Sequence, residues 1–277
     1  MMIHRSVLHR LILLSILPLA AFLPVTPYEA AGAGGAEVVQ ISPDRSQEVV
    51  SRFDALVGPL VLPDHLMAEG AERAEGDFDV GSYFAVLDRL WMEFGYSLDY
   101  VYDYAGIGGA PVLYARPSDQ PAYRNYAEYL AADAAKSREE REDFYLRHVQ
   151  TDGTAESFFQ LALLCIQGEQ FYQFWHAAYN DDKIISSQEE ARSALDELSG
   201  WVGEDASTIE ALLKDVAGHD LAPVVTMDEE MVKVEVVVFT KWGGFLQRSM
   251  TVKREFPHEI LAEGEEVLVE YDCGIMF

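Results

Sequence analysis

The chain has 277 residues, of which 49% are hydrophobic and 24% charged, and its formal net charge is −27. This is the composition of a globular protein with enough apolar material for a sizeable core in one or two domains. The 47 Asp and Glu against 20 Lys and Arg disfavour nucleic acid as a partner. The acidity suits solubility, and it is compatible with a saline habitat, cation binding or a basic partner.

The first residues have the three parts of a secretory signal peptide. Arg5 and Arg10 give a basic start, residues 11–23 form an uninterrupted apolar core, and small residues follow up to Gly35. The core of 13 residues is shorter than the roughly 20 residues that cross a bilayer comfortably. We therefore predict a signal peptide at residues 1–30 and export to the periplasm, the cell envelope or the exterior. The alternatives are a buried N-terminal helix and an uncleaved anchor, which would be the only expected contact with a membrane.

Residues 31–41 are rich in Gly and Ala and are expected to form a linker. From 42 to 222 the apolar residues repeat mostly at helical spacing, which predicts a mainly helical region. Capping patterns mark several helix starts, among them Ser42 before Pro43. The predicted helices cover residues 42–57, 82–94, 121–149 (as one helix or two), 154–180, 187–199 and 207–217.

Two parts of the chain have the period-two pattern of strands. A short hairpin is predicted near residues 98–115, around a glycine cluster. Residues 223–277 are predicted to be an antiparallel β region, with a hairpin around Gly243 and Gly244 and a third strand from Glu265. The predicted fold class is α+β: a mainly helical body with a C-terminal antiparallel β-meander packed on it, as one compact domain.

The predicted C-terminal hairpin offers a first candidate binding site. A two-residue turn at Gly243 and Gly244 would place Trp242 opposite Phe245. An exposed Trp242 beside Lys241 would be able to stack on a sugar ring or a peptide. The alternative is that Trp242 packs on Phe245 across the strands and closes the edge of the core.

A second candidate is a carboxylate and an imidazole in the predicted helix 154–180. Glu169 and His176 are two turns apart on the same side of such a helix, where they would serve proton transfer. A zinc helix would need a second ligand four residues after His176, but that position is Asn180. An ordinary packed histidine is the alternative, and no metal site or cofactor is predicted.

A third candidate combines arginines with tyrosines between residues 114 and 129. Tyr114, Arg116 and Arg124 lie among three further tyrosines, a composition suited to a small anion or a carbohydrate. The alternative is that the tyrosines pack internally and the arginines pair with nearby acids. Cys165 and Cys273 are the two cysteines, and export would permit a disulfide between them. Cys165 lies in an apolar run, where a buried thiol is the ordinary outcome.

The functional prediction follows from these features and from the lack of a catalytic sequence motif. We expect an exported acidic protein that acts by non-catalytic binding in the cell envelope or extracellular space, rather than an enzyme. A secreted hydrolase that uses Glu169 and His176 is one alternative. A structural partner in an envelope assembly is another.

Overall fold

The computed structural model describes residues 35–134, 145–175, 181–202, 206–271 and Cys273. The expected signal peptide at residues 1–30 and the candidate His176 lie outside the described residues. None of the helices in the described part combines the length and apolarity needed to span a bilayer. The last residues of the expected linker, Glu37–Gln40, form strand β1.

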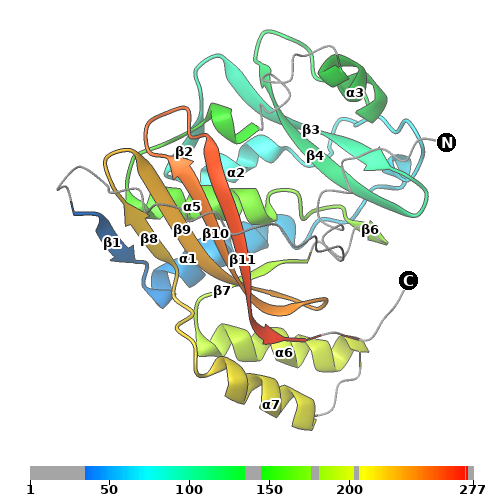
Figure 1. Ribbon diagram of the computed structural model, residues 1–277. Coiled ribbons are helices and arrows are strands. Elements are labelled where there is room, and N and C mark those ends of the chain that lie inside the picture. The colour runs from blue at the N-terminus through cyan, green and yellow to red at the C-terminus, as the bar shows by residue number, and fades with distance from the viewer. Residues whose placement is uncertain (1–34, 135–144, 176–180, 203–205, 272, 274–277) are drawn as a thin grey trace, which may run out of the picture. The chain divides into compact units, whose positions relative to one another are not determined.

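The prediction of a mainly helical body is wrong, because the chain is 33% helix and 32% strand. Its largest element is an antiparallel sheet of six strands that draws on residues from both ends of the described chain (Figure 1). The sequence pattern missed this because β1 and β7 have only four and three residues. The strand order is β1 (Glu37–Gln40), β8 (Val224–Met227), β9 (Met231–Thr240), β10 (Gly244–Lys253) and β11 (Ile260–Glu270), and β7 (Lys183–Ile185) also pairs with β9.

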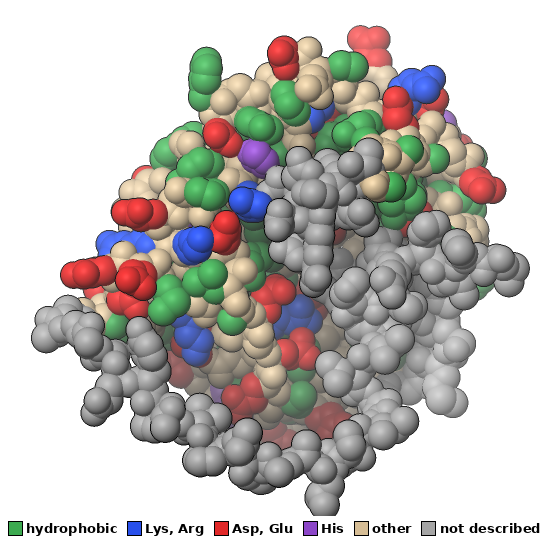
Figure 2. Space-filling view, turned by 45° about the horizontal axis from the view of Figure 1, so that its top comes forward, with side chains coloured by type: hydrophobic (Ala, Val, Ile, Leu, Met, Phe, Trp, Pro, Cys, Tyr) green, Lys and Arg blue, Asp and Glu red, His purple; other side chains and the backbone are tan. Residues whose placement is uncertain are grey.

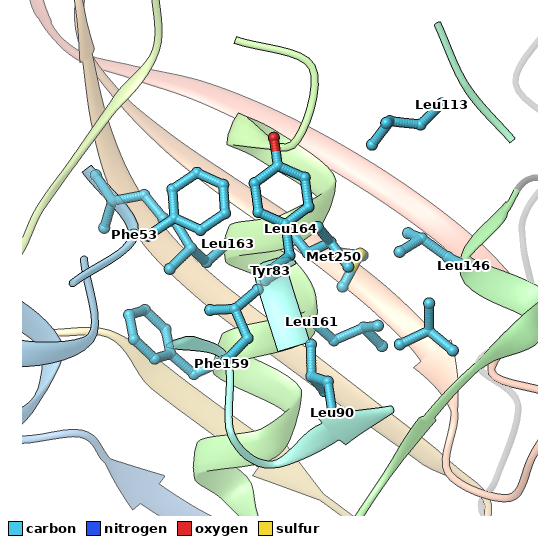
Figure 3. Close-up of a cluster of buried hydrophobic side chains, with 14 of the residues drawn as sticks. Phe53, Tyr83, Leu90, Leu113, Leu146, Phe159, Leu161, Leu163, Leu164 and Met250 are labelled. Carbon is cyan, nitrogen blue, oxygen red and sulfur yellow. The ribbon is translucent and has the colours of Figure 1, made fainter. Parts of the chain in front are cut away.

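One face of this sheet packs against helices α1 (Pro43–Val57) and α5 (Ala155–Gln167) (Figure 1). Val234, Val236 and Val238 of β9 belong to this first core. The apolar pattern of α5 predicts a central helix surrounded by its neighbours, and its residues from Ser157 to Leu164 are all buried. Figure 3 shows α5 side chains packed beside aromatic and aliphatic ones from α1, α2 and β10. Each such side chain, when fully buried, contributes about 1.5–3 kcal/mol.

The opposite face of the sheet packs against helices α6 (Gln188–Val202) and α7 (Ala206–Val216). Val237 and Phe239 of β9 point to this second core, because successive side chains of a strand alternate between faces. Both helices match their predicted positions. Both faces of β9 are buried from Val236 onward, which explains the uninterrupted apolar run from Val236 to Phe239.

The helix predicted over residues 82–94 ends after a single turn. The short helix α2 (Tyr83–Val86) follows a 3-10 turn, η3 (Val80–Ser82), and stops at Leu87. Strand β2 (Leu90–Met92) then pairs antiparallel with β5 (Val149–Thr151). Tertiary contacts therefore override the helical spacing of this segment.

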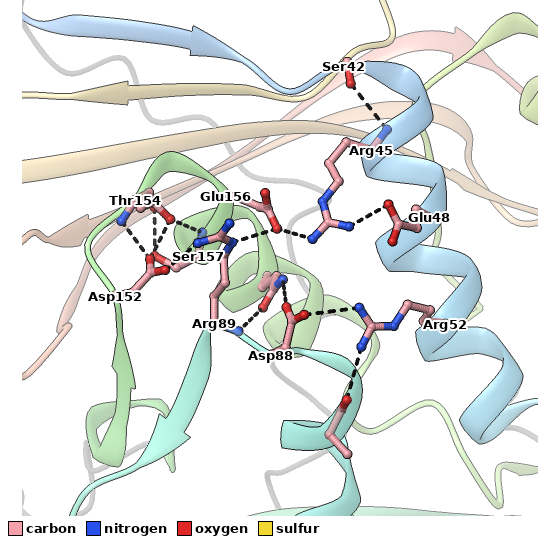
Figure 4. Close-up of polar contacts among 12 residues, drawn as sticks. Ser42, Arg45, Glu48, Arg52, Asp88, Arg89, Asp152, Thr154, Glu156 and Ser157 are labelled. Carbon is pink, nitrogen blue, oxygen red and sulfur yellow. Dashed lines mark hydrogen bonds and ion pairs between the residues drawn. The ribbon is translucent and has the colours of Figure 1, made fainter.

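Two backbone groups identify the contacts that end this helix. In a continuing helix, Arg89 N would donate to the carbonyl of Ala85. Instead Arg89 N donates to Gln160 Oε1 of α5 at 3.0 Å, and the Ala85 carbonyl accepts from Arg52 Nη2 of α1 at 3.2 Å (Figure 4). Both groups are satisfied without a further helical turn, so the chain is free to extend.

The predicted hairpin near residues 98–115 is confirmed and is longer than expected. Strands β3 (Tyr96–Tyr104) and β4 (Gly108–Pro117) pair along their whole length, and β6 (Phe174–Trp175) joins β4 to make a three-stranded sheet. After β4 the chain forms helix α3 (Tyr126–Ala134), and the 3-10 turn η4 (Tyr145–His148) precedes β5. Another 3-10 turn, η2 (Asp64–Leu66), lies between α1 and α2.

The helix predicted over residues 154–180 ends at Gln167, so that prediction is wrong for residues 168–175, and residues 176–180 lie outside the described chain. Beyond it Phe171 and Tyr172 are both buried, and the Phe171 ring lies 5.0 Å from that of Tyr100. Tyr172 has a left-handed φ of 52°, which turns the chain toward β6. Both adjacent aromatic side chains are buried in this conformation, and the chain does not continue as a helix.

The C-terminal meander is confirmed, but the predicted hairpin register is wrong. Thr240 pairs with Gly244, so the loop contains three residues, 241–243. Phe245 lies opposite Phe239, with their ring centroids 4.8 Å apart, and does not face Trp242. Gly244 sets this register: its φ is 83°, and a Cβ there would lie 2.2 Å from the Val269 carbonyl oxygen of β11.

Ion pairs join α1, α5 and β2 at one edge of the first core (Figure 4). Glu156 Oε1 forms ion pairs with Arg45 Nη2, at 2.5 Å, and with Arg89 Nε, at 2.8 Å. Burial opposes ionisation of Glu156, but hydrogen bonds from both guanidinium groups outweigh it and lower the pKa of the carboxyl group. On the face drawn in Figure 2, acidic and basic side chains lie interspersed with apolar ones. The large negative charge is therefore not gathered into a single acidic block on that face.

Candidate functional site

The most heavily paired buried carboxylate in the three-stranded sheet is Asp99 of β3. It is only 7% exposed, and burial of a carboxylate is costly unless the charge is paired. Arg116 Nε of β4 donates to Asp99 Oδ2 at 2.9 Å, and Arg73 Nη1 donates to Asp99 Oδ1. The backbone N–H of Tyr100 also donates to Oδ1, at 2.9 Å. One carboxylate thus holds two guanidinium groups in fixed positions.

Arg73 reaches this position from the loop between η2 and α2, and its guanidinium is held on several sides. Its guanidinium carbon lies 4.0 Å from the centroid of the Tyr100 ring, a cation–π distance. Its terminal nitrogens also lie 3.4 Å from the carbonyl oxygens of Tyr100 and Phe78. These contacts fix the orientation of the Arg73 guanidinium. Little further side-chain entropy is therefore lost when Arg73 binds a ligand.

Beside these charges lies a cavity of about 330 Å³. We call it the arginine–tyrosine pocket, and its lining is Glu72, Arg73, Asp99, Ala122, Tyr123 and Arg124. Arg73 and Asp99 form its charged floor, whereas Tyr123 and Arg124 come from the segment between β4 and α3. Two guanidinium groups, a phenol ring and two carboxylates therefore line one space.

A cluster of tyrosines fixes the segment that carries Tyr123 and Arg124. The backbone N–H of Tyr123 donates to the Tyr114 hydroxyl at 3.0 Å. The Tyr114 ring centroid lies 4.9 Å from that of Tyr123 and 5.5 Å from that of Tyr129. Burial raises the pKa of Tyr114, so its hydroxyl stays neutral at physiological pH. The internal packing of the tyrosines and the pairing of Arg116 and Arg124 with acids, which were the alternative to a binding site here, are thus both present, and the packing supports the pocket wall.

The structure brings together most of the third candidate site and adds two residues to it. Arg116 and Tyr114 contact the lining residues Asp99 and Tyr123. Arg124 lines the pocket itself, with a side chain 72% exposed and 3.2 Å from Glu128. Sequence reasoning missed Arg73, which lies alone in a polar loop with no motif around it. Asp99 had a usable signal, because it is an acid within a β-rich aromatic run.

The Trp242 candidate site has a different environment from the one expected. Trp242 is half-buried, and Lys241 Nζ lies 3.3 Å from Asp181 Oδ2. Thr240 Oγ1 donates to Asp181 Oδ1 at 2.5 Å, which ties the start of the loop to the segment before β7. Phe245 is completely buried in the second core. Phe245 therefore has no surface to offer a ligand.

The Glu169 and His176 candidate loses its helical basis, because α5 ends before both residues. Glu169 Oε1 accepts a hydrogen bond from the backbone N–H of Leu113 at 2.8 Å, while His176 lies outside the described residues. Within the described ranges, no group of three or more His, Cys, Asp or Glu is arranged to hold a metal ion.

The two cysteines pack on opposite faces of the six-stranded sheet. Cys165 contacts the first core and Cys273 contacts the second, and both are half-buried. Neither forms a disulfide in the described part of the chain. The structure therefore does not bring the two thiols together.

Comparison of the chain with protein-family models, with curated proteins and with solved structures finds no match. Its chemistry must therefore be inferred from its own residues. Among the candidate sites, the arginine–tyrosine pocket is the one in which several predicted residues and a cavity coincide.

Proposed function

We propose that the chain is an exported binding protein that holds a small anionic ligand in the arginine–tyrosine pocket. The observation that carries this proposal is the pairing of one buried carboxylate, Asp99, with two guanidinium groups beside a cavity. The lining carries two positive charges, Arg73 and Arg124, and two negative charges, Glu72 and Asp99, and Arg116, which pairs with Asp99, adds a third positive charge and leaves a net charge of +1. In a chain with a net charge of −27, this local excess of positive charge attracts an anion to the pocket.

The chemistry of the lining narrows the ligand class. A guanidinium presents its N–H groups in a planar fork that matches a carboxylate or a phosphate. The phenol ring of Tyr123 gives a flat apolar surface for the rest of the ligand. A cavity of about 330 Å³ is at the lower end of the range of about 300–1,000 Å³ for ligand sites. We therefore expect a small carboxylate or phosphate, including an acidic sugar.

Thermal unfolding with added ligands tests this proposal. The probes are phosphate, citrate, glucuronate and, as the neutral counterpart of glucuronate, glucose. A ligand that binds only the folded chain raises the midpoint by mass action. We expect a rise with one or more anions, and none with glucose at the same concentration.

A pair of matched variants locates the binding. Arg124→Gln removes an exposed guanidinium from the pocket and is expected to reduce the anion-induced rise. Arg192→Gln makes the same change on α6, where the side chain is 54% exposed, and should leave the rise intact. No rise with any anion, or the same rise in Arg124→Gln as in the native chain, would refute an anion site in this pocket.

Export is the second part of the proposal and is supported by the basic, apolar and small-residue parts of residues 1–35. Expression of the full chain, followed by cell fractionation and intact-mass measurement, tests it. We expect a product outside the cytoplasm that has lost about 30 N-terminal residues. A full-length product in the envelope would indicate an uncleaved anchor, and a full-length cytoplasmic product would disprove export.

A further inference from the structure

Among the described residues, strand β11 is the outermost strand of the six-stranded sheet and leaves one edge unpaired (Figure 1). In the described part of the chain it pairs with β10 alone. Residues 261–267 are all exposed. The far edge of an outer strand carries N–H and C=O groups able to pair with another extended chain. This edge is long, because β11 has 11 residues.

The exposed part of β11 is strongly acidic. Glu263 lies opposite Met250 and Glu265 opposite Arg248, so both point to the α1 and α5 side of the sheet. Glu265 pairs with Arg248 at 3.1 Å, whereas Glu263 has no ion-pair partner among the described residues. Val267 follows on the same side and is 56% exposed. The edge thus combines acids with an exposed apolar side chain at alternate positions.

We propose that β11 binds an extended, basic segment of a partner protein as an additional strand of the sheet. Strand addition obtains its affinity from main-chain hydrogen bonds and its specificity from alternate side chains. Glu263 and Glu265 would each lie beside a cross-strand neighbour, where an opposite charge stabilises the pair and a like charge destabilises it. A second copy of this chain would place acids against acids, so the charge selects a basic partner.

The register also defines the sequence pattern of the partner. Regular pairing with β10 extends over residues 262–267, between irregularities next to Leu246 and Val252. A strand beside this stretch would place an apolar residue near Val267 and Lys or Arg near Glu265 and Glu263. Because side chains alternate, these partner residues are two apart. The intervening residues would face Glu266 and Gly264 on the other side of the sheet. This inference does not depend on the proposed anion site.

Fluorescence anisotropy with short labelled peptides tests the proposal on the full mature chain. In the basic peptide every second residue is threonine, and the residues between them are valine, lysine, lysine and valine in that order. The acidic peptide has glutamate in place of each lysine. Two further forms of the basic peptide carry N-methyl groups on alternate backbone nitrogens, one form for each edge of the strand. We expect binding of the basic peptide, none of the acidic peptide, and loss of binding in only one of the two methylated forms.

Variants of the chain separate β11 from general electrostatic attraction. Glu263→Lys is expected to weaken the binding of the basic peptide by about threefold to tenfold, because an attractive cross-strand pair becomes repulsive. Glu69→Lys makes the same change in net charge in the loop after η2 and should leave binding unchanged. Equal binding of both methylated forms, or no binding of the basic peptide, would overturn strand addition. A dimer of the chain alone that the peptide dissociates would assign the edge to a second copy and would equally overturn the proposal.

Discussion

Replacement of Asp99 by Asn tests whether the carboxylate holds the pocket together. The substitution keeps the shape of the side chain and one acceptor oxygen, but it removes the negative charge between Arg73 and Arg116. Two guanidinium groups then lie close together without a compensating charge. We expect the variant to fold and to be considerably less stable than the native chain.

The size of this effect follows from burial. Removal of one partner of a buried ion pair costs about 3–5 kcal/mol, because the other charge stays buried without compensation. Here the side chains of Arg73 and Arg116 are 24% and 23% exposed, so water compensates part of the loss. We therefore expect a loss of about 2–3 kcal/mol. In a domain of this size each kcal/mol shifts the midpoint by about 2–4 °C, which predicts a fall of about 4–12 °C.

Urea unfolding and thermal scans measure the loss, with Asp119→Asn as the control. Asp119 is exposed in the turn after β4, so the stability of its variant should differ from that of the native chain by less than about 0.5 kcal/mol. The variant Asp99→Asn should also respond more strongly to added anion, because its floor has one more positive charge. A midpoint equal to that of the control would refute the reasoning about Asp99.

Three further predictions concern the stability of the folded chain. Gly244→Ala should cost about 2 kcal/mol or more, since its φ is 83° and a Cβ would lie 2.2 Å from a backbone oxygen of β11. Gly243→Ala, whose Cβ would meet nothing closer than 3.4 Å, should cost much less in the same urea titration. Burial lowers the pKa of His258 in the folded chain below its ordinary value of 6.5. As the pH falls through 6.5, the unfolded chain therefore takes up this proton more readily than the folded chain does, and the free energy of unfolding decreases. Urea unfolding from pH 5 to 8 should show this dependence in the native chain and lose it in His258→Gln. Glu156→Gln should lower the free energy of unfolding by about 1–2 kcal/mol at neutral pH. Its control Glu48→Gln, at a side chain 56% exposed, should lower it by less than about 0.5 kcal/mol. Equal losses in urea unfolding would contradict the role given to the Glu156 pairs.

The sequence predicted the elements whose cause is local. Capping residues and apolar spacing located α1, α6 and α7, and alternation located the hairpin of β3 and β4. The six-stranded sheet was missed because β1 and β7, the two strands outside the predicted C-terminal β region, are too short for alternation to be visible. Short strands of this kind are defined by the strand they pair with, which is β9 for β7 and β8, and β8 for β1. Their existence is a property of the tertiary structure.

The helix predicted over residues 82–94 failed for a related reason. Its apolar spacing is real, but Gln160 and Arg52 from two other helices bind the backbone groups that would extend it. A side chain of α5, more than 70 residues away, therefore decides the local structure, and no window of sequence contains both partners.

The pocket follows the same division between local and long-range causes. Tyr114, Arg116 and Arg124 are close in sequence, so their composition pointed to a site before the fold was known. Asp99 meets Arg116 because β3 pairs with β4, and Arg73 reaches the same carboxylate from a separate loop. The local residues supply the wall and two of the arginines, and the long-range contact of Arg73 with Asp99 completes the charged floor. A variant of the wall, such as Arg124→Gln, should therefore change binding with little effect on stability, whereas Asp99→Asn should change both.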